Sequence, residues 1–211
     1  MKTELKIKIQ RSFLDNYKRD LHLHPDFISF ENKDLVGSGI TSFKTDEIKE
    51  FRYGVTLYQY DIVFGRDFQI FIKNFNDEVL KINFKSYFGI KKSEYTKIYA
   101  EIINTVWDLY FKQKVILFIK AFEVGESFTI GDVDINSDGV LITISKLLKQ
   151  EKKLINWKDI GIRKYTTYVS IYSRENPLDF NRGYSYKEDW NTFVLYEVIR
   201  NILENKNINN D

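Results

Sequence analysis

Two amphipathic helix patterns stand at matching places in the sequence, and each closes a long run of strand-like residues. Positions 96–104 read TKIYAEIIN and positions 192–200 read TFVLYEVIR, a separation of 96 positions (192 minus 96). Apolar residues recur in both at the spacing of a helix with one buried face. The sequence therefore predicts two modules, each a set of strands closed by a C-terminal helix.

The residues before each helix have the alternation typical of antiparallel strands. The first half has strand patterns at 5–9, 27–30, 55–63, 68–73 and 79–84, with turns at 64–67 and 74–78. The second half has strand patterns at 128–130, 133–135, 140–145, 160–165 and 168–173, with a tight turn at 136–139 and a charged hairpin tip at 149–153. Consecutive hairpins of this kind predict an α+β fold, in which each module is a curved antiparallel sheet, or partly open barrel, with one closing helix.

The two helices differ in predicted length. The first begins at the N-cap Ser93, and its apolar spacing continues to about Phe122. The second begins at the N-cap Asp189 and ends in a polar tail. The expected domains are residues 1–122 and 126–211, joined by the long first helix.

Composition excludes several classes of function. The chain has 211 residues, 43% of them hydrophobic, which suffices for one large or two small cores. Its net charge of +2 lacks the basic excess of a nucleic-acid-binding protein, and the absence of cysteine excludes thiolate nucleophiles and sulfur-ligated metals. The N-terminus does not read as a signal peptide, and the apolar run at 115–119 is far shorter than the roughly 20 residues of a membrane span. We expect a cytoplasmic protein without a transmembrane segment.

Three short segments carry a resemblance to a known family. The stretch 154–160 (LINWKDI) and the residues Trp190, Asn191 and Thr192 resemble what bacterial pleckstrin-homology-like (PH-like) domains carry, and 45–51 (TDEIKEF) is a fainter match. The resemblance covers most of the chain except the first 24 residues and the extended middle helix. It implies two tandem PH-like modules that bind peptides, lipids or copies of themselves, and thus a non-enzymatic binding or scaffolding protein without a cofactor.

Metal and catalytic motifs are incomplete. The stretch 134–139 (DINSDG) begins like a calcium-binding EF-hand loop, but Ser145 stands where that loop needs a bidentate glutamate, so we expect a hairpin turn. His22 and His24 with Asp26 supply only part of a zinc site, and a solvent-facing loop is expected there. A metal-dependent enzyme that uses carboxylates between the modules is an alternative to the binding function, and the sequence does not favour it.

A lysine-rich hairpin is the candidate ligand contact. It comprises Lys146, Lys149, Lys152 and Lys153. In lipid-binding PH domains a basic hairpin loop holds the inositol phosphates, so the resemblance implies a peripheral membrane module as an alternative. Glu151 interrupts this run, and no arginine offers a bidentate phosphate clamp, so a solvated loop tip is the main interpretation.

The middle helix is the candidate partner surface. Trp107, Phe111, Val115 and Phe118 lie roughly opposite its apolar stripe. We expect this face to bind a protein partner or a second copy of the chain.

Four residues near the second helix are expected to have structural roles. These are Trp157, Asp159, Trp190 and Asn191. The two tryptophans should pack in the core, and Asp159 should cap or bond nearby backbone. Asn191 falls in the apolar arc predicted for the last helix, so its amide should bond backbone groups of the adjoining sheet.

Overall fold

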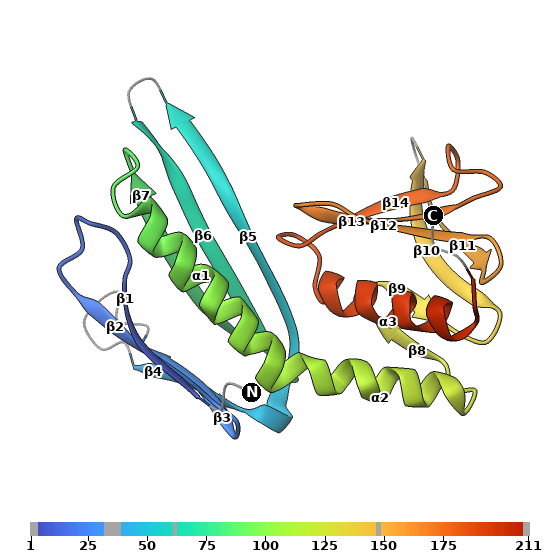
Figure 1. Cartoon of the computed structure of the whole chain (residues 1–211), viewed down its shortest axis with the longest axis horizontal. Coiled ribbons are helices and arrows are strands. Elements are labelled where there is room, and N and C mark those ends of the chain that lie inside the picture. Colours follow the sequence, from blue (N-terminus) through green and yellow to red (C-terminus); the bar gives the residue numbers. More distant parts are fainter. Residues whose placement is uncertain (1–3, 32–38, 61–62, 147–148, 209–211) are drawn as a thin grey trace. The chain divides into compact units, whose positions relative to one another are not determined.

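The chain is an α+β protein whose strands form open antiparallel sheets (Figure 1). The computed structural model describes residues 4–31, 39–60, 63–146 and 149–208. It divides into two compact units, Met1–Lys112 and Gln113–Asp211. The division falls within the long helix that the sequence predicts, so part of this helix belongs to each unit.

The first unit has two sheets followed by a helix. One sheet has the order β1 (Leu5–Gln10), β2 (Lys18–His24), β3 (Phe27–Glu31) and β4 (Ile40–Lys44). After the short helix η1 (Thr45–Glu47), the other has the order β5 (Ile48–Tyr60), β6 (Val63–Asn74) and β7 (Val79–Tyr87). The chain then enters α1 (Lys92–Val106) and the π-helical turn η2 (Trp107–Phe111).

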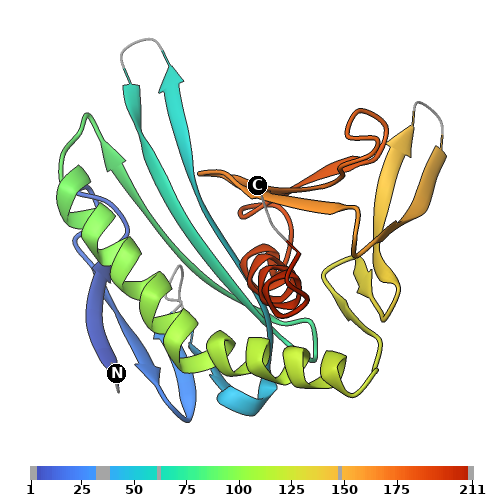
Figure 2. The ribbon, with the colours of Figure 1, turned by 45° about the vertical axis from the view of Figure 1, so that its right-hand side comes forward.

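The second unit follows the same order of elements. After α2 (Lys112–Glu123), one sheet contains β8 (Phe128–Ile130), β9 (Val133–Ile135), β10 (Gly139–Lys146) and β11 (Lys149–Asn156). The other contains β12 (Ile160–Lys164), β13 (Tyr168–Ser173) and β14 (Asn181–Ser185), and α3 (Thr192–Asn205) follows it. In the described part of each unit, a four-stranded sheet therefore precedes a three-stranded sheet and a helix (Figure 2).

One face of the three-stranded sheet forms much of the core in the first unit. Alternate residues of β6 and β7 are buried on this face: Phe68, Ile70, Ile72, Leu80, Ile82 and Phe84. The helix α1 packs against both strands, with the Tyr95 ring 5.3 Å from Phe84 and the Tyr99 ring 5.3 Å from Phe68. Each large apolar side chain buried here contributes roughly 1.5–3 kcal/mol to folding.

The predicted N-caps are wrong, because both helices begin at a residue with left-handed backbone. These residues are Lys91 (φ +57°) and Asn191 (φ +58°). Ser93 lies inside α1, and the Asp189 carboxylate instead accepts a hydrogen bond from the Ser185 backbone N–H at 2.7 Å. The two helix starts are 100 positions apart (191 minus 91). This exceeds the 96-residue spacing of the sequence match by about one helical turn, which leaves the same face buried.

The predicted turn at 64–67 is also wrong, because these residues belong to β6 and pair with β5, and from Gly65 onward they also pair with β7. The glycine in this stretch, Gly65, is typical of a turn but here lies within a strand. A Cβ at Gly65 would lie 2.0 Å from the Ser86 carbonyl oxygen and 2.3 Å from the Tyr58 hydroxyl, so close packing within the sheet requires glycine. The charged tip predicted at 149–153 is likewise part of a strand, β11.

We expect Gly65→Ala to destabilise the first unit by about 1–3 kcal/mol, because the new methyl group overlaps a backbone carbonyl that cannot move without disturbing the sheet. Urea unfolding followed through the amide signals of β6 measures this effect. Gly39→Ala is the matched control, since a Cβ there meets nothing within 4 Å. Equal unfolding midpoints for the two variants would show that Gly65 is not sterically constrained.

Candidate ligand-binding site

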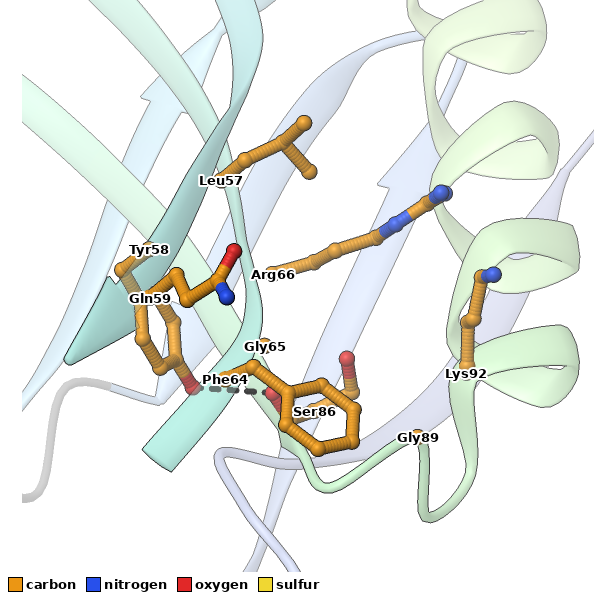
Figure 3. A pocket seen from close by; sticks show the side chains of 9 residues that line it. All are labelled: Leu57, Tyr58, Gln59, Phe64, Gly65, Arg66, Ser86, Gly89 and Lys92. Atoms are coloured by element: carbon orange, nitrogen blue, oxygen red, sulfur yellow. Dashed lines mark hydrogen bonds between the residues drawn. The ribbon is translucent and has the colours of Figure 1, made fainter. Parts of the chain in front are cut away.

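A pocket of about 340 Å³ lies in the first unit, near the end of the β5–β6 hairpin and beside the start of α1 (Figure 3). Its lining residues come from the end of β5, the start of β6, the end of β7 and the turn into α1: Leu57, Tyr58, Gln59, Phe64, Gly65, Arg66, Ser86, Gly89 and Lys92. This volume lies within the range of small-molecule sites.

Two cationic side chains in this pocket lack a counter-ion within the described part of the chain. Figure 3 shows Arg66 and Lys92 extending toward the same space from the sheet and from α1. Among the described residues, neither side chain has a hydrogen-bond or ion-pair partner. The neighbouring acid Asp67 lies on the same strand, but its carboxylate is 3.5 Å from the Lys85 ammonium group. The pocket therefore presents positive charge that an anion would neutralise.

A buried hydroxyl adds to this site. Ser86 is 1% exposed, and its Oγ has no hydrogen-bond partner within the described part of the chain. Leaving a buried polar group unpaired costs about 1–3 kcal/mol. Figure 3 shows this hydroxyl on the side of the pocket that faces Arg66 and Lys92. A ligand acceptor in the pocket would satisfy it.

One wall of the pocket is held by a tyrosine. The Tyr58 hydroxyl donates a hydrogen bond to the Ser86 carbonyl oxygen at 2.8 Å and crosses over Gly65, while its ring lies 5.6 Å from Tyr87. Burial, together with the neighbouring Tyr87, raises the pKa of Tyr58 to about 12. The hydroxyl therefore stays protonated well above neutral pH and can keep donating its hydrogen bond to the Ser86 carbonyl oxygen.

Two residues that line the pocket are apolar and exposed. Leu57 and Phe64 line the pocket with exposed fractions of 70% and 51%. The Phe64 ring packs edge-on against Phe88, 5.9 Å away, in the turn before α1. The pocket thus combines cationic side chains with exposed apolar side chains.

Two other pockets are less suited to a charged ligand. In the second unit, a pocket of about 290 Å³ contains Lys206, but its ammonium group lies 5.3 Å from the centre of the Phe122 ring, and Glu123 adds negative charge. A third pocket of about 60 Å³ contains Lys91, which donates a hydrogen bond to Gln10 at 2.7 Å. Lys206 and Lys91 thus already have partners within the chain, and the third pocket is small.

The lysine-rich hairpin does not form a cluster in the part of it that the structure describes. Lys152 lies 2.5 Å from the Asp134 carboxylate, and Lys153 lies 2.7 Å from Glu151. Lys152 and Lys153 are neighbours in β11, and successive side chains of a strand point to opposite faces. The side chains of Lys146 and Lys149 lie outside the described residues.

Two of the four residues of the candidate partner surface on the middle helix are buried, and the other two are half-buried. This surface was predicted from Trp107, Phe111, Val115 and Phe118. Phe111 is fully buried with its ring 4.1 Å from Phe51, and Val115 is 6% exposed. The rings of Trp107 and Phe118 also contact rings within their own units. The large exposed apolar residues of α2 are instead Ile116 and Leu117.

Trp157 and Asp159 both connect parts of the second unit. Trp157 is buried and donates its indole N–H to the Asn136 carbonyl oxygen at 2.9 Å. The Asp159 carboxylate accepts hydrogen bonds from the Glu175 backbone N–H at 2.7 Å and from the Ser173 hydroxyl at 2.5 Å. Both residues therefore have structural roles.

Trp190 and Asn191 lie at the entry to α3. Trp190 is half-buried, and its carbonyl oxygen would be 2.9 Å from a Cβ on Gly131. The placement of Asn191 in the apolar arc of the helix is wrong, because this residue precedes the helix as its left-handed N-cap. Asparagine tolerates this backbone conformation better than most residues.

The residues of the two incomplete metal motifs also have structural roles. His22 and His24 lie in β2 and not in a loop, and the His24 ring stacks on Phe27 at 5.0 Å. The Asn136 side chain accepts hydrogen bonds from the Asp138 and Gly139 backbone N–H groups, which makes the expected tight turn. No group of three or more histidine, aspartate or glutamate side chains that could hold a metal ion occurs among the described residues.

Comparison with protein-family models finds no match, and comparison with curated protein sequences finds none either. None of the helices in the described part of the chain combines the length and the apolar character needed to cross a membrane. The pocket geometry is therefore the main guide to function.

The sequence did not predict this pocket, because the stretch 64–67 looked like a turn. The only signal of the pocket in the sequence was an arginine beside a glycine, between two strand patterns.

We expect Lys152→Gln to raise the pKa of Asp134. Hydrogen bonds from Lys152 and Thr129 hold this pKa below the ordinary value of 3.8, so their stabilising effect is present above that pH and is lost as the pH falls through the lowered pKa. An NMR titration of the Asp134 carboxyl group measures the change. Lys153→Gln is the control on the opposite face of β11, and an equal response to both substitutions would contradict the pairing.

Proposed function

We propose that the chain is a non-enzymatic binding protein built from two PH-like modules, and that the first module binds an anionic ligand in the pocket beside α1. The repeated order of a four-stranded sheet, a three-stranded sheet and a helix supports the two-module interpretation. It agrees with what the resemblance to bacterial PH-like domains implies for the sequence.

The observation that carries this proposal is a pair of cations, Arg66 and Lys92, next to the buried Ser86 hydroxyl, none of which has a partner among the residues that the structure describes. A guanidinium group forms paired hydrogen bonds with phosphate or carboxylate, and an ammonium group adds a point charge. The lining residues of the pocket include no carboxylate and no imidazole. These side chains therefore support binding of an anion more directly than acid–base catalysis.

The alternative of a membrane module that uses the lysine-rich hairpin has weaker support. Lys152 and Lys153 each have an acidic partner and lie on opposite faces of one strand, so they do not converge on a shared anion. Self-association through the middle helix remains a prediction, and a surface for it would have to include Ile116 and Leu117.

Titration with inorganic phosphate at low ionic strength, followed by NMR, tests the proposal. We expect Arg66→Gln and Lys92→Gln each to weaken binding about tenfold or more, because a hydrogen bond to a charged group contributes roughly 1.5–3 kcal/mol. Lys97→Gln is the matched control, since this exposed lysine lies in α1 but outside the pocket. Equal phosphate affinity for the wild type and the Arg66→Gln, Lys92→Gln double variant would refute the site.

A further inference from the structure

The pocket lies on the face of the sheet that forms the core of the first unit. Phe64 and Arg66 precede Phe68 in β6 at intervals of two residues, so all three point to the same side of the sheet. Phe68 is buried beneath α1, in contact with the Tyr99 ring. The pocket is therefore the continuation of the core face beyond the start of α1.

Strand register places the polar and apolar groups of the pocket in one row. Arg66 is directly opposite Leu57 of β5 on one side and Ser86 of β7 on the other. Directly opposed residues in antiparallel strands share a face. The row thus contains the exposed Leu57, the cationic Arg66 and the buried Ser86 hydroxyl. Lys92 of α1 lies beside this row (Figure 3).

From this row we infer that the ligand is an amphiphilic anion. This inference rests on the anion site proposed above. Its phosphate or carboxylate group would bind between Arg66 and Lys92 and accept a hydrogen bond from Ser86. Its apolar body would lie against Leu57 and Phe64, which a small inorganic anion leaves exposed to water. Covering this hydrocarbon adds affinity in proportion to the area that is removed from water.

Two sources can supply this chemistry, a free amphiphile in solution and an anionic lipid in a membrane. Phe88 and Ile90, in the turn before α1, are 47% and 44% exposed and lie next to Gly89, which lines the pocket. Both sources present the same charged head and apolar chain to the site, and binding assays with and without vesicles distinguish them.

The test compares octyl phosphate, below its micelle concentration, with inorganic phosphate and with octyl glucoside, whose head group is neutral. We expect octyl phosphate to bind at least about tenfold more tightly than inorganic phosphate, because burial of two methylene groups suffices for this factor. Octyl glucoside should bind more weakly than octyl phosphate. Equal affinity for octyl phosphate and inorganic phosphate would overturn the inference and leave the anion site standing, whereas binding of neither anion would remove both.

Substitution of an exposed apolar residue separates the two parts of the ligand without disturbing the core. Phe64→Ser should remove most of the advantage of octyl phosphate and leave the affinity for inorganic phosphate within about twofold of the wild type. Phe75→Ser is the matched control, because this phenylalanine is 62% exposed and follows the opposite end of β6. An equal effect of both substitutions on octyl phosphate would contradict the assigned contact.

Co-sedimentation with phosphatidylcholine vesicles that do or do not contain phosphatidic acid identifies the source. A membrane source predicts co-sedimentation only with phosphatidic acid, and its loss in both Arg66→Gln and Phe64→Ser. Binding of octyl phosphate without co-sedimentation supports a free amphiphile. Co-sedimentation that neither substitution alters would place the lipid contact elsewhere and overturn the inference.

Discussion

The core face of the second sheet in the first unit is longer than the helix that covers it. The strand β6 has 12 residues and spans about 40 Å, whereas α1 and η2 together have 20 residues and span about 30 Å. The helix starts where β7 ends, and Figure 1 shows β5 and β6 extending beyond that point. Part of an otherwise buried face is therefore left uncovered, and the pocket lies there.

On the other face of the sheet, a pair of residues in adjacent strands braces this uncovered end. The Tyr58 ring covers Gly65 on the adjacent strand, and its hydroxyl reaches across to the backbone of β7. The second unit uses a related pair, since Tyr172 is directly opposite Gly161 and its ring fills the space that a Cβ there would take. In both sheets an aromatic ring fills the space that the side chain of a non-glycine residue would take.

The sequence predicted correctly those features that depend on the residue pattern within a single helix or strand. Period-two alternation located many of the strands, and helical spacing located the long helical run over α1, η2 and α2. Features that depend on tertiary packing were missed. The N-cap at Lys91 has no sequence signature, because lysine has no side-chain preference for a left-handed cap. The burial of Phe111 depends on Phe51, a strand residue far away in the sequence. Arg66, Ser86 and Lys92 form a site only through strand register and the position of α1.

A map of backbone amide shifts in the full chain upon addition of octyl phosphate tests the assigned site most directly. The largest shifts are expected at Gly65, Arg66, Ser86 and Lys92, which come from three separate elements and meet only in the pocket. Shifts that centre on residues 149–156 of β11, or that spread evenly over both units, would contradict the assignment of the ligand to this pocket.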